Sequence, residues 1–411
     1  MEPSDPLPLN GMFERSQSLE EPEGRTFSSD DFTKAFGEDL RQTLDVSTWR
    51  VGSDLAAEYA RIDTEVQQAV RDEDALQEGI RAIVFPKLAE MRKVPNAGVH
   101  AARPEELEAV HRGLLFNGGV DACYGSLHVH QTLPLTIYQI GVSLVSYQGD
   151  QGNFCQRLYR RDLRQSIDDP IEETLRIIEG RAAADEEGGA GFLIQKTLLA
   201  YAERAILARR SEAVWRMGHG NPVTYEMLTG GGNLELMEAC INVARDLIEG
   251  HRKFVFVGRQ PRALHLLTIG QALLPYHFAI VMKLADHLGH WLHQHRFVDI
   301  RNLPWDGVPL PSSEWIPRFI NTVSSQVVVG LFRASALTPA QLFFAHEDHA
   351  DIAAHIAIAD SMLREPHGSP LLLEMARHVG EAVFGDNLET LAQAAYAAAG
   401  APWRYRTNRT R

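Results

Sequence analysis

Three residues in the middle of the chain carry side chains that could bind a metal ion or move a proton. Asp121 follows a pair of glycines, Glu203 lies in a segment with helical periodicity, and His219 lies in a glycine-rich loop. Carboxylate oxygens are the usual ligands of Mg²⁺ and Mn²⁺, and a neutral imidazole also binds Mn²⁺ and other transition metals. Each residue also has a structural interpretation: a turn cap for Asp121, a partner of a nearby arginine for Glu203, and a simple loop residue for His219.

Two histidine-rich stretches are further candidates for metal binding. The stretch 346–355 begins with His-Glu-Asp-His and lacks the His-Glu-x-x-His spacing that places two ligands on one helix face, so zinc-protease chemistry is excluded. The stretch 287–295 has histidines at three-residue steps, a row that drifts around a helix axis, and it contains no acid to complete a ligand set. We therefore expect 287–295 to form a polar helix face.

From about residue 114 the pattern predicts strands. The expected strands are 114–126, 135–147 and 154–159. The second is rich in β-branched and aromatic residues, and a turn at 149–153 joins it to the third. Consecutive strands of this kind pair antiparallel in the simplest arrangement. Helical segments then alternate with further strands, which predicts an α/β protein with a mixed sheet flanked by helices. The later predicted elements are strands at 253–257 and 327–332 and helices at 171–181, 192–210, 234–250, 272–295, 350–363 and 371–384.

The chain divides into three parts by composition and pattern. Residues 1–30 are acidic and rich in proline and serine, which predicts a disordered tail. Residues 31–99 carry apolar residues at three- and four-residue steps, such as Ile62 and Val66, which predicts a helical arm. Residues 100–411 form the main domain. A chain of 411 residues is long enough for two structural units.

The composition excludes several classes of protein. The hydrophobic content of 45% is that of a folded, enzyme-sized protein, and no apolar run reaches the roughly 18 residues that span a bilayer. The N-terminus lacks the basic start and apolar middle of a signal peptide, so we expect a cytoplasmic protein. Three cysteines without close spacing exclude a disulfide framework and a cysteine-based zinc site. The net charge of −14 argues against a protein that coats nucleic acid with its whole surface, but it leaves room for a basic channel.

The order of elements resembles that of RNase H-like nucleases, which place an essential aspartate on the first strand of a three-strand meander. Within that class, the chain resembles the NurA nucleases. The segment 118–126 is similar to their opening Asp-Gly-Ser motif, with Asp121 at the acid position and with Ala122 and Cys123 in place of glycine and serine. Glu203 lies on the helix before the next short strand, where NurA proteins carry a glutamate.

Two later motifs depart further from the NurA pattern. His219 stands where the family has its second aspartate. The stretch 368–378 resembles the closing motif of Gly–aromatic–Pro followed by Leu and Ala, with Arg377 at the polar position and His378 next to it. The resemblance covers roughly residues 105–390 and rests on order and spacing more than on identical residues.

The resemblance implies a metal-dependent DNA nuclease, in which Asp121 and Glu203 hold Mn²⁺ or Mg²⁺ and His219 is a third catalytic group. It also implies a homodimer that docks onto a HerA-type hexameric ATPase, with the helical arm at the dimer or docking surface, and a role in DNA end processing or anti-phage defence. Because His219 replaces an acid, the alternative is a catalytically inactive NurA-like subunit that binds DNA or the ATPase as a scaffold. A third interpretation is an unrelated α/β protein with a similar meander. The arginines expected to contact DNA are Arg160, Arg161, Arg164, Arg259, Arg262 and Arg377.

Overall fold

The structure is a computed structural model that describes residues 28–49, 54–132, 134–148, 153–162, 171, 174–175, 178–179, 193–261, 263–289 and 302–403. The predictions for the tail up to residue 27, for Arg164, for Arg262 and for the histidines at 290–295 lie outside the described residues. No helix within the described ranges is both long enough and apolar enough to cross a membrane. Cys123, Cys155 and Cys240 are free cysteines.

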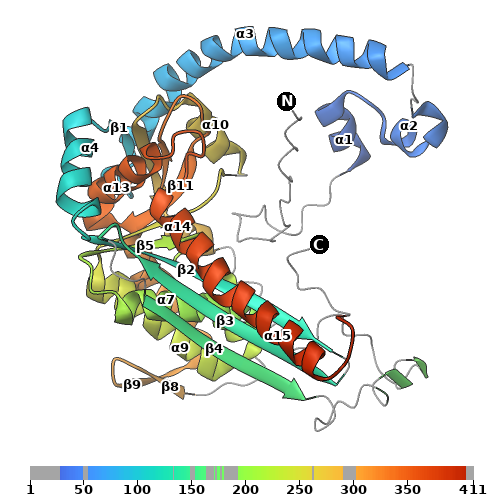
Figure 1. Cartoon of the computed structure of the whole chain (residues 1–411). Coiled ribbons are helices and arrows are strands. Elements are labelled where there is room, and N and C mark those ends of the chain that lie inside the picture. The colour runs from blue at the N-terminus through green and yellow to red at the C-terminus, as the bar shows by residue number, and fades with distance from the viewer. Residues whose placement is uncertain are drawn as a thin grey trace, which may run out of the picture.

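A nine-stranded mixed sheet forms the centre of the fold (Figure 1). Its strands, in sheet order, are β1 (Gly98–Ala101), β7 (His277–Lys283), β10 (Val327–Arg333), β11 (Gln341–His346), β6 (Phe254–Val257), β5 (Trp215–His219), β2 (Val120–Gln131), β3 (Leu135–Val145) and β4 (Asn153–Asp162). β2, β3 and β4 form an antiparallel meander, which confirms the three predicted strands. β5 runs parallel to both β2 and β6. The predicted mixed α/β class is confirmed.

Helices cover both faces of this sheet, and each face has its own apolar cluster. We call these faces the α7 face and the α14 face. The α7 face carries α7 (Leu199–Arg210), α8 (Tyr225–Thr229), α9 (Leu234–Arg245), α10 (Leu264–Ala272), α11 (Leu284–Leu288) and α12 (Ser312–Thr322). The α14 face carries α4 (Pro104–Val110), α13 (Ala350–Met362) and α14 (Leu371–Gly380). Short 3-10 or π-helical turns are η1 (Val46–Thr48), η2 (His111–Leu115), η3 (Leu193–Leu198), η4 (Gly230–Gly232), η5 (Asp246–His251), η7 (Ser324–Gln326), η8 (Glu347–His349) and η9 (Glu381–Gly385).

The run 272–295, predicted to be one helix, instead contains β7 followed by α11. β7 lies inside the sheet between β1 and β10, and Phe278, Ala279 and Ile280 are all buried although they alternate between the two faces. A central strand that is covered on both faces is apolar at every position. Such a run has no period that separates it from a buried helix. The prediction of a helix there was therefore wrong for a physical reason.

α14 continues through η9 into α15 (Asp386–Ala398), and together they lie along β2 and β3 (Figure 1). Ser143 of β3 donates a hydrogen bond from Oγ to the carbonyl oxygen of Ala376 at 2.6 Å. Gly141 of β3 makes room for the ring of Phe384, because a Cβ at that position would lie 2.1 Å from a ring atom. These contacts fix the C-terminal helices over the meander.

The helical arm consists of α1 (Ser29–Phe36), α2 (Leu40–Leu44) and the long α3 (Asp54–Ala89), which leads into β1. Near its C-terminal end, α3 packs on the main sheet through Val84, Phe85 and Leu88. Figure 1 shows the rest of α3 extending away from the sheet, with α1 and α2 near its far end. A separate two-stranded ribbon is formed by β8 (Asn302–Trp305) and β9 (Val308–Pro311).

Candidate functional site

Glu203 of α7 binds a backbone N–H of β2 that lies past the end of β5. The last residues paired between β2 and β5 are Cys123 and Gly218, and β2 continues beyond this pair. There the N–H of Gly125 donates to Glu203 Oε1 at 2.7 Å. A Cβ at Gly125 would come within 2.5 Å of Glu203 Cγ, so glycine permits the close approach. The carboxylate of Glu203 therefore satisfies a group that a neighbouring strand would otherwise satisfy.

The second oxygen of Glu203 forms an ion pair with Nη1 of Arg204. The side chain of Arg204 is only 1% exposed. Its Nη2 donates to the carbonyl oxygen of Asn221 at 2.6 Å, and its guanidinium carbon lies 5.5 Å from the ring centre of Phe256. A buried guanidinium requires a counter-charge, and Glu203 supplies it. Both carboxylate oxygens of Glu203 are thus engaged by donors of the protein itself.

Asp121 belongs to a different hydrogen-bond network at the other end of α7. Its Oδ2 accepts a hydrogen bond from Oγ of Ser211, the residue that follows α7, at 2.7 Å. Arg216 pairs with Asp121 across β2 and β5, and it donates to the carbonyl oxygen of Ser211 at 3.1 Å. Asp121 and Gly125 are four residues apart on β2, which corresponds to about 13 Å along a strand. The structure therefore does not bring the carboxylates of Asp121 and Glu203 to one point.

His219 lies on the opposite face of the sheet. The residues two and four positions before it on β5 belong to the apolar cluster of the α14 face, so the alternation of side chains places His219 on that face as well. Its ring centre is 5.9 Å from that of Tyr124. Burial, together with the positive charges of Arg259, Arg204 and Arg377, lowers the pKa of His219 to about 4. The imidazole is therefore neutral at physiological pH.

These residues do not fit a Mg²⁺ or Mn²⁺ ion. In the described part of the chain, no three side chains of the His, Cys, Asp or Glu type gather closely enough to hold a metal. Glu203 is neutralised by Arg204, Asp121 is bound to Ser211, and His219 lies across the sheet from both acids. Hard divalent ions require several oxygen ligands that converge on one point, and this arrangement does not provide them.

Four of the six arginines predicted to bind DNA lie among the described residues, and these four occupy two separate places. Arg160 and Arg161 lie on β4, the edge strand, and successive residues of a strand point to opposite faces. Arg259, which follows β6, and Arg377 of α14 are both close enough to His219 to lower its pKa. Arg377 also donates from Nη1 to Glu381 at 3.1 Å. Among the described members of this set, Arg259 and Arg377 therefore act electrostatically on one side chain, His219, at the end of β5.

Tyr124 lies beside His219, and the sequence comparison did not identify it as a site residue. The stretch Tyr124-Gly125-Ser126 offers a second match to the Asp-Gly-Ser motif, with the glycine and serine intact and a tyrosine at the acid position. Tyr124 lies on the same face as His219, whereas Asp121 lies on the α7 face. The intact Gly-Ser pair was the signal that could have identified Tyr124. With this match, the two positions at which the motif pattern has aspartate are occupied here by Tyr124 and His219, which both have aromatic side chains.

The histidines of the stretch 346–355 have structural partners. His346 accepts a hydrogen bond at Nδ1 from the N–H of Asp348 at 3.2 Å, and its Nε2 lies 3.3 Å from Oε1 of Gln326. His355 lies with Nε2 at 3.2 Å from an oxygen of Glu106. The side chains of His346 and His355 thus connect β11 and α13 to neighbouring elements, and in the described part of the chain they belong to no group of metal ligands.

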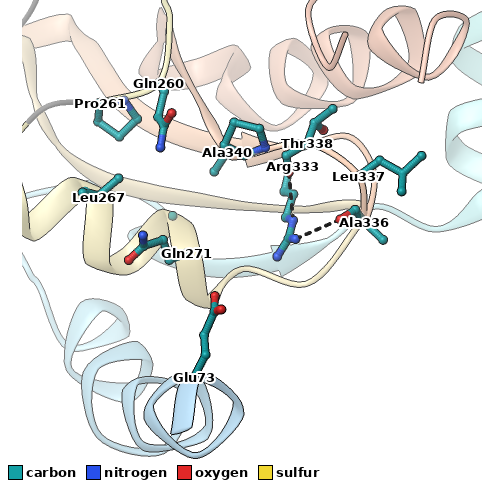
Figure 2. Close-up of a pocket in the computed structure, with 12 residues that line it drawn as sticks. Glu73, Gln260, Pro261, Leu267, Gln271, Arg333, Ala336, Leu337, Thr338 and Ala340 are labelled. Carbon is teal, nitrogen blue, oxygen red and sulfur yellow. Dashed lines mark hydrogen bonds between the residues drawn. The ribbon is translucent and has the colours of Figure 1, made fainter. Parts of the chain in front are cut away.

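A cavity of about 270 Å³ lies elsewhere, between α3, α10 and the loop before β11 (Figure 2). Arg333 lines it, but its Nη1 donates to the carbonyl oxygen of Leu273 at 2.8 Å and its Nε to that of Ser335 at 3.2 Å. Glu73 reaches the cavity from α3. Because the guanidinium of Arg333 holds a loop in place, the lining does not offer a pair of titratable groups poised for catalysis.

Comparisons with known proteins concern the fold. No family model and no curated protein matches the chain. The crystal structure of the NurA nuclease from Sulfolobus solfataricus covers 86% of this chain and 100% of its own, with a TM-score of 0.42 and 10% identity. A second NurA structure covers 82% of this chain and 97% of its own, with a TM-score of 0.39 and 9% identity, and a NurA structure with manganese covers 71% and 95%, with a TM-score of 0.34 and 10% identity. These NurA structures align with 71–86% of this chain, at 9–10% identity.

Proposed function

We propose that this chain is a NurA-like DNA-binding protein that does not hydrolyse DNA with a divalent metal ion. The observation that carries this proposal is the engagement of Glu203 by Arg204 and by the N–H of Gly125. A carboxylate that neutralises a buried guanidinium is not available to a cation without leaving that guanidinium unpaired, which is costly. The scaffold alternative drawn from the sequence is therefore favoured over the metal-dependent nuclease.

We place the DNA-binding site at the carboxyl ends of β5 and β6, where the positive charges of Arg259 and Arg377 contribute to the low pKa of His219. In sheets with parallel strands, ligands commonly bind outside the carboxyl ends of those strands. Guanidinium groups match phosphate oxygens in charge and in hydrogen-bond geometry. Two arginines from different elements support two contacts to backbone phosphates, in a protein whose overall charge is negative.

A scaffold of this kind would act beside a HerA-type ATPase, as a homodimer, in DNA end processing or defence. These parts of the proposal come from the sequence resemblance. A pull-down with the purified ATPase and a measurement of mass in solution test them separately from DNA binding.

The central test measures binding and cleavage in parallel. Binding of a fluorescently labelled DNA duplex is followed by anisotropy in EDTA, with wild type, Arg259→Ala, Arg377→Ala and the matched control Arg61→Ala. Arg61 is exposed on α3, away from β5. We expect each site substitution to weaken binding by about tenfold and Arg61→Ala to leave it unchanged.

Cleavage is measured on linear DNA with Mn²⁺ or Mg²⁺, with and without the ATPase. We expect no cleavage under any of these conditions. Metal-dependent cleavage that disappears in Glu203→Gln would overturn the assignment of a silent site. If Arg61→Ala weakens DNA binding as much as Arg259→Ala and Arg377→Ala do, the proposed location of the binding site is wrong.

A further inference from the structure

The N-terminal half of α3 presents an apolar stripe to solvent. Leu55, Tyr59, Ile62, Val66 and Val70 follow one another at steps of four, three, four and four residues, which places them on one face of a helix. Their exposed fractions lie between 38% and 65%. Five large apolar side chains in a row on a solvent-exposed helix indicate an interaction surface, because scattered exposed apolar residues do not align in this way.

The stripe lies on the part of α3 that extends from the main sheet (Figure 1). α3 has 36 residues, which corresponds to about 54 Å of helix. It is anchored near its C-terminal end, where Val84 and Phe85 pack on the core and Nη1 of Arg81 donates to the carbonyl oxygen of Ala272 at 3.2 Å. The surface formed by Leu55 to Val70, which we call the α3 stripe, therefore lies on a helical extension and is exposed.

Acidic side chains border the α3 stripe on both sides. Glu58 and Glu65 lie along one edge, and Asp63 lies along the other. The basic residue beside them, Arg61, is within ion-pair distance of both Glu58 and Glu65. The border as a whole is therefore negative. A partner that covers the stripe must bring positive charge to these edges.

The negative border of the α3 stripe decides whether it binds a second copy of α3 or a helix of another protein. In helical pairs, the residues that flank the apolar seam face those of the partner. A second copy of α3 would place acids opposite acids in either orientation, and the sequence before α1 is also rich in acids. We propose that the α3 stripe docks an amphipathic helix of another protein whose apolar seam is flanked by lysine or arginine. Charge then selects the partner, and apolar burial holds it.

The test uses the full chain and two synthetic helical peptides. Both peptides have leucine and isoleucine at the seam positions of a heptad repeat, and the flanking positions are lysine in one and glutamate in the other. Binding is measured by fluorescence anisotropy of the labelled peptides. We expect the lysine peptide to bind the chain at least about tenfold more tightly than the glutamate peptide.

Matched variants separate the stripe from general charge effects. Ile62→Asp combined with Val66→Asp should weaken binding of the lysine peptide by about tenfold or more, whereas Thr64→Asp with Gln68→Asp, which adds the same charge on the opposite face, should not. Glu58→Lys combined with Glu65→Lys should transfer the preference to the glutamate peptide. This last variant keeps every seam residue, so it reports on charge selection even if the aspartate variant disturbs the helix.

Three results would overturn the proposal. The first is equal binding of both peptides or of neither, and the second is an equal loss in the two aspartate variants. The third is a dimer of the wild-type chain, seen by sedimentation equilibrium, that Ile62→Asp with Val66→Asp converts to monomer, since the occupant would then be a second copy. None of these outcomes depends on whether the chain binds DNA.

Discussion

Glu203 and Arg204 form the pair of residues on which the proposal of a function without a divalent metal ion depends. If Glu203 is a structural counter-charge, Glu203→Gln leaves the buried guanidinium of Arg204 without its partner while the amide oxygen can still accept from Gly125. We expect the free energy of unfolding to fall by about 2–4 kcal/mol, measured by urea denaturation. Glu235→Gln on the exposed side of α9 is the matched control and should change stability little. If Glu203 were instead a metal ligand with no structural role, Glu203→Gln would not lower the free energy of unfolding.

A second residue-level prediction concerns Asp360, which is fully buried in α13. Tyr147 donates its hydroxyl to Oδ1 at 2.5 Å and the N–H of Leu372 donates to Oδ2 at 3.0 Å. Burial nevertheless raises the pKa of Asp360 from 3.8 to about 6. As pH rises between these values, the unfolded chain loses the proton before the folded protein does. The folded state then binds more protons than the unfolded state, so stability falls with rising pH, by on the order of 3 kcal/mol across this window.

Asp360→Asn should remove this penalty. The amide can accept from Leu372 and donate to the oxygen of Tyr147, so both partners are kept. We expect the variant to be more stable than wild type above about pH 7 and to lose that advantage near pH 4, as measured by denaturation at both values. A constant difference at all pH values would show that Asp360 does not titrate between them.

At the scale of elements, the seating of the C-terminal helices on β3 depends on Gly141. A Cβ there would overlap the ring of Phe384, so Gly141→Ala should force η9 away from the sheet and cost about 1–3 kcal/mol in thermal or urea unfolding. Gly250→Ala, where a Cβ would meet no atom within 4 Å, is the control and should be close to neutral. The cost of Gly141→Ala should shrink in a Phe384→Leu background, because the two side chains then no longer compete for one space. If Gly141→Ala costs as much stability in the Phe384→Leu background as in wild type, contact with Phe384 is not the cause of the cost.

At the scale of the whole molecule, the net charge of −14 means that the proposed DNA binding must rely on a small cationic site. Two arginine–phosphate contacts correspond to a slope of about −2 in a plot of the logarithm of affinity against the logarithm of salt concentration. Affinity should therefore fall about tenfold between roughly 50 and 200 mM salt. Arg377→Ala should reduce the slope by about one. A slope several times steeper would mean that a much larger basic surface contacts DNA.

The strands of the meander and the mixed α/β class could be predicted because they depend on residue patterns within single segments of the sequence. β3 is a long β-branched and aromatic run, and a turn separates it from β4. Side-chain periodicity is a property of a segment and its own neighbours, so it survives without knowledge of the rest of the fold. β7 shows the limit of such patterns, since a strand buried on both faces carries no period at all.

The roles of the site residues could not be predicted in this way. Adjacent residues of a helix such as Glu203 and Arg204 do not normally face each other, so nothing in their spacing indicates that they pair. They pair because the register of β5 against β2 leaves the N–H of Gly125 without a neighbouring strand and brings Asn221 beneath α7. The same register sends His219 to the opposite face of the sheet. Residue types along the chain thus indicated which groups could do chemistry, but long-range strand pairing determined which of them meet, because contacts across a sheet depend on alignments that no local pattern encodes.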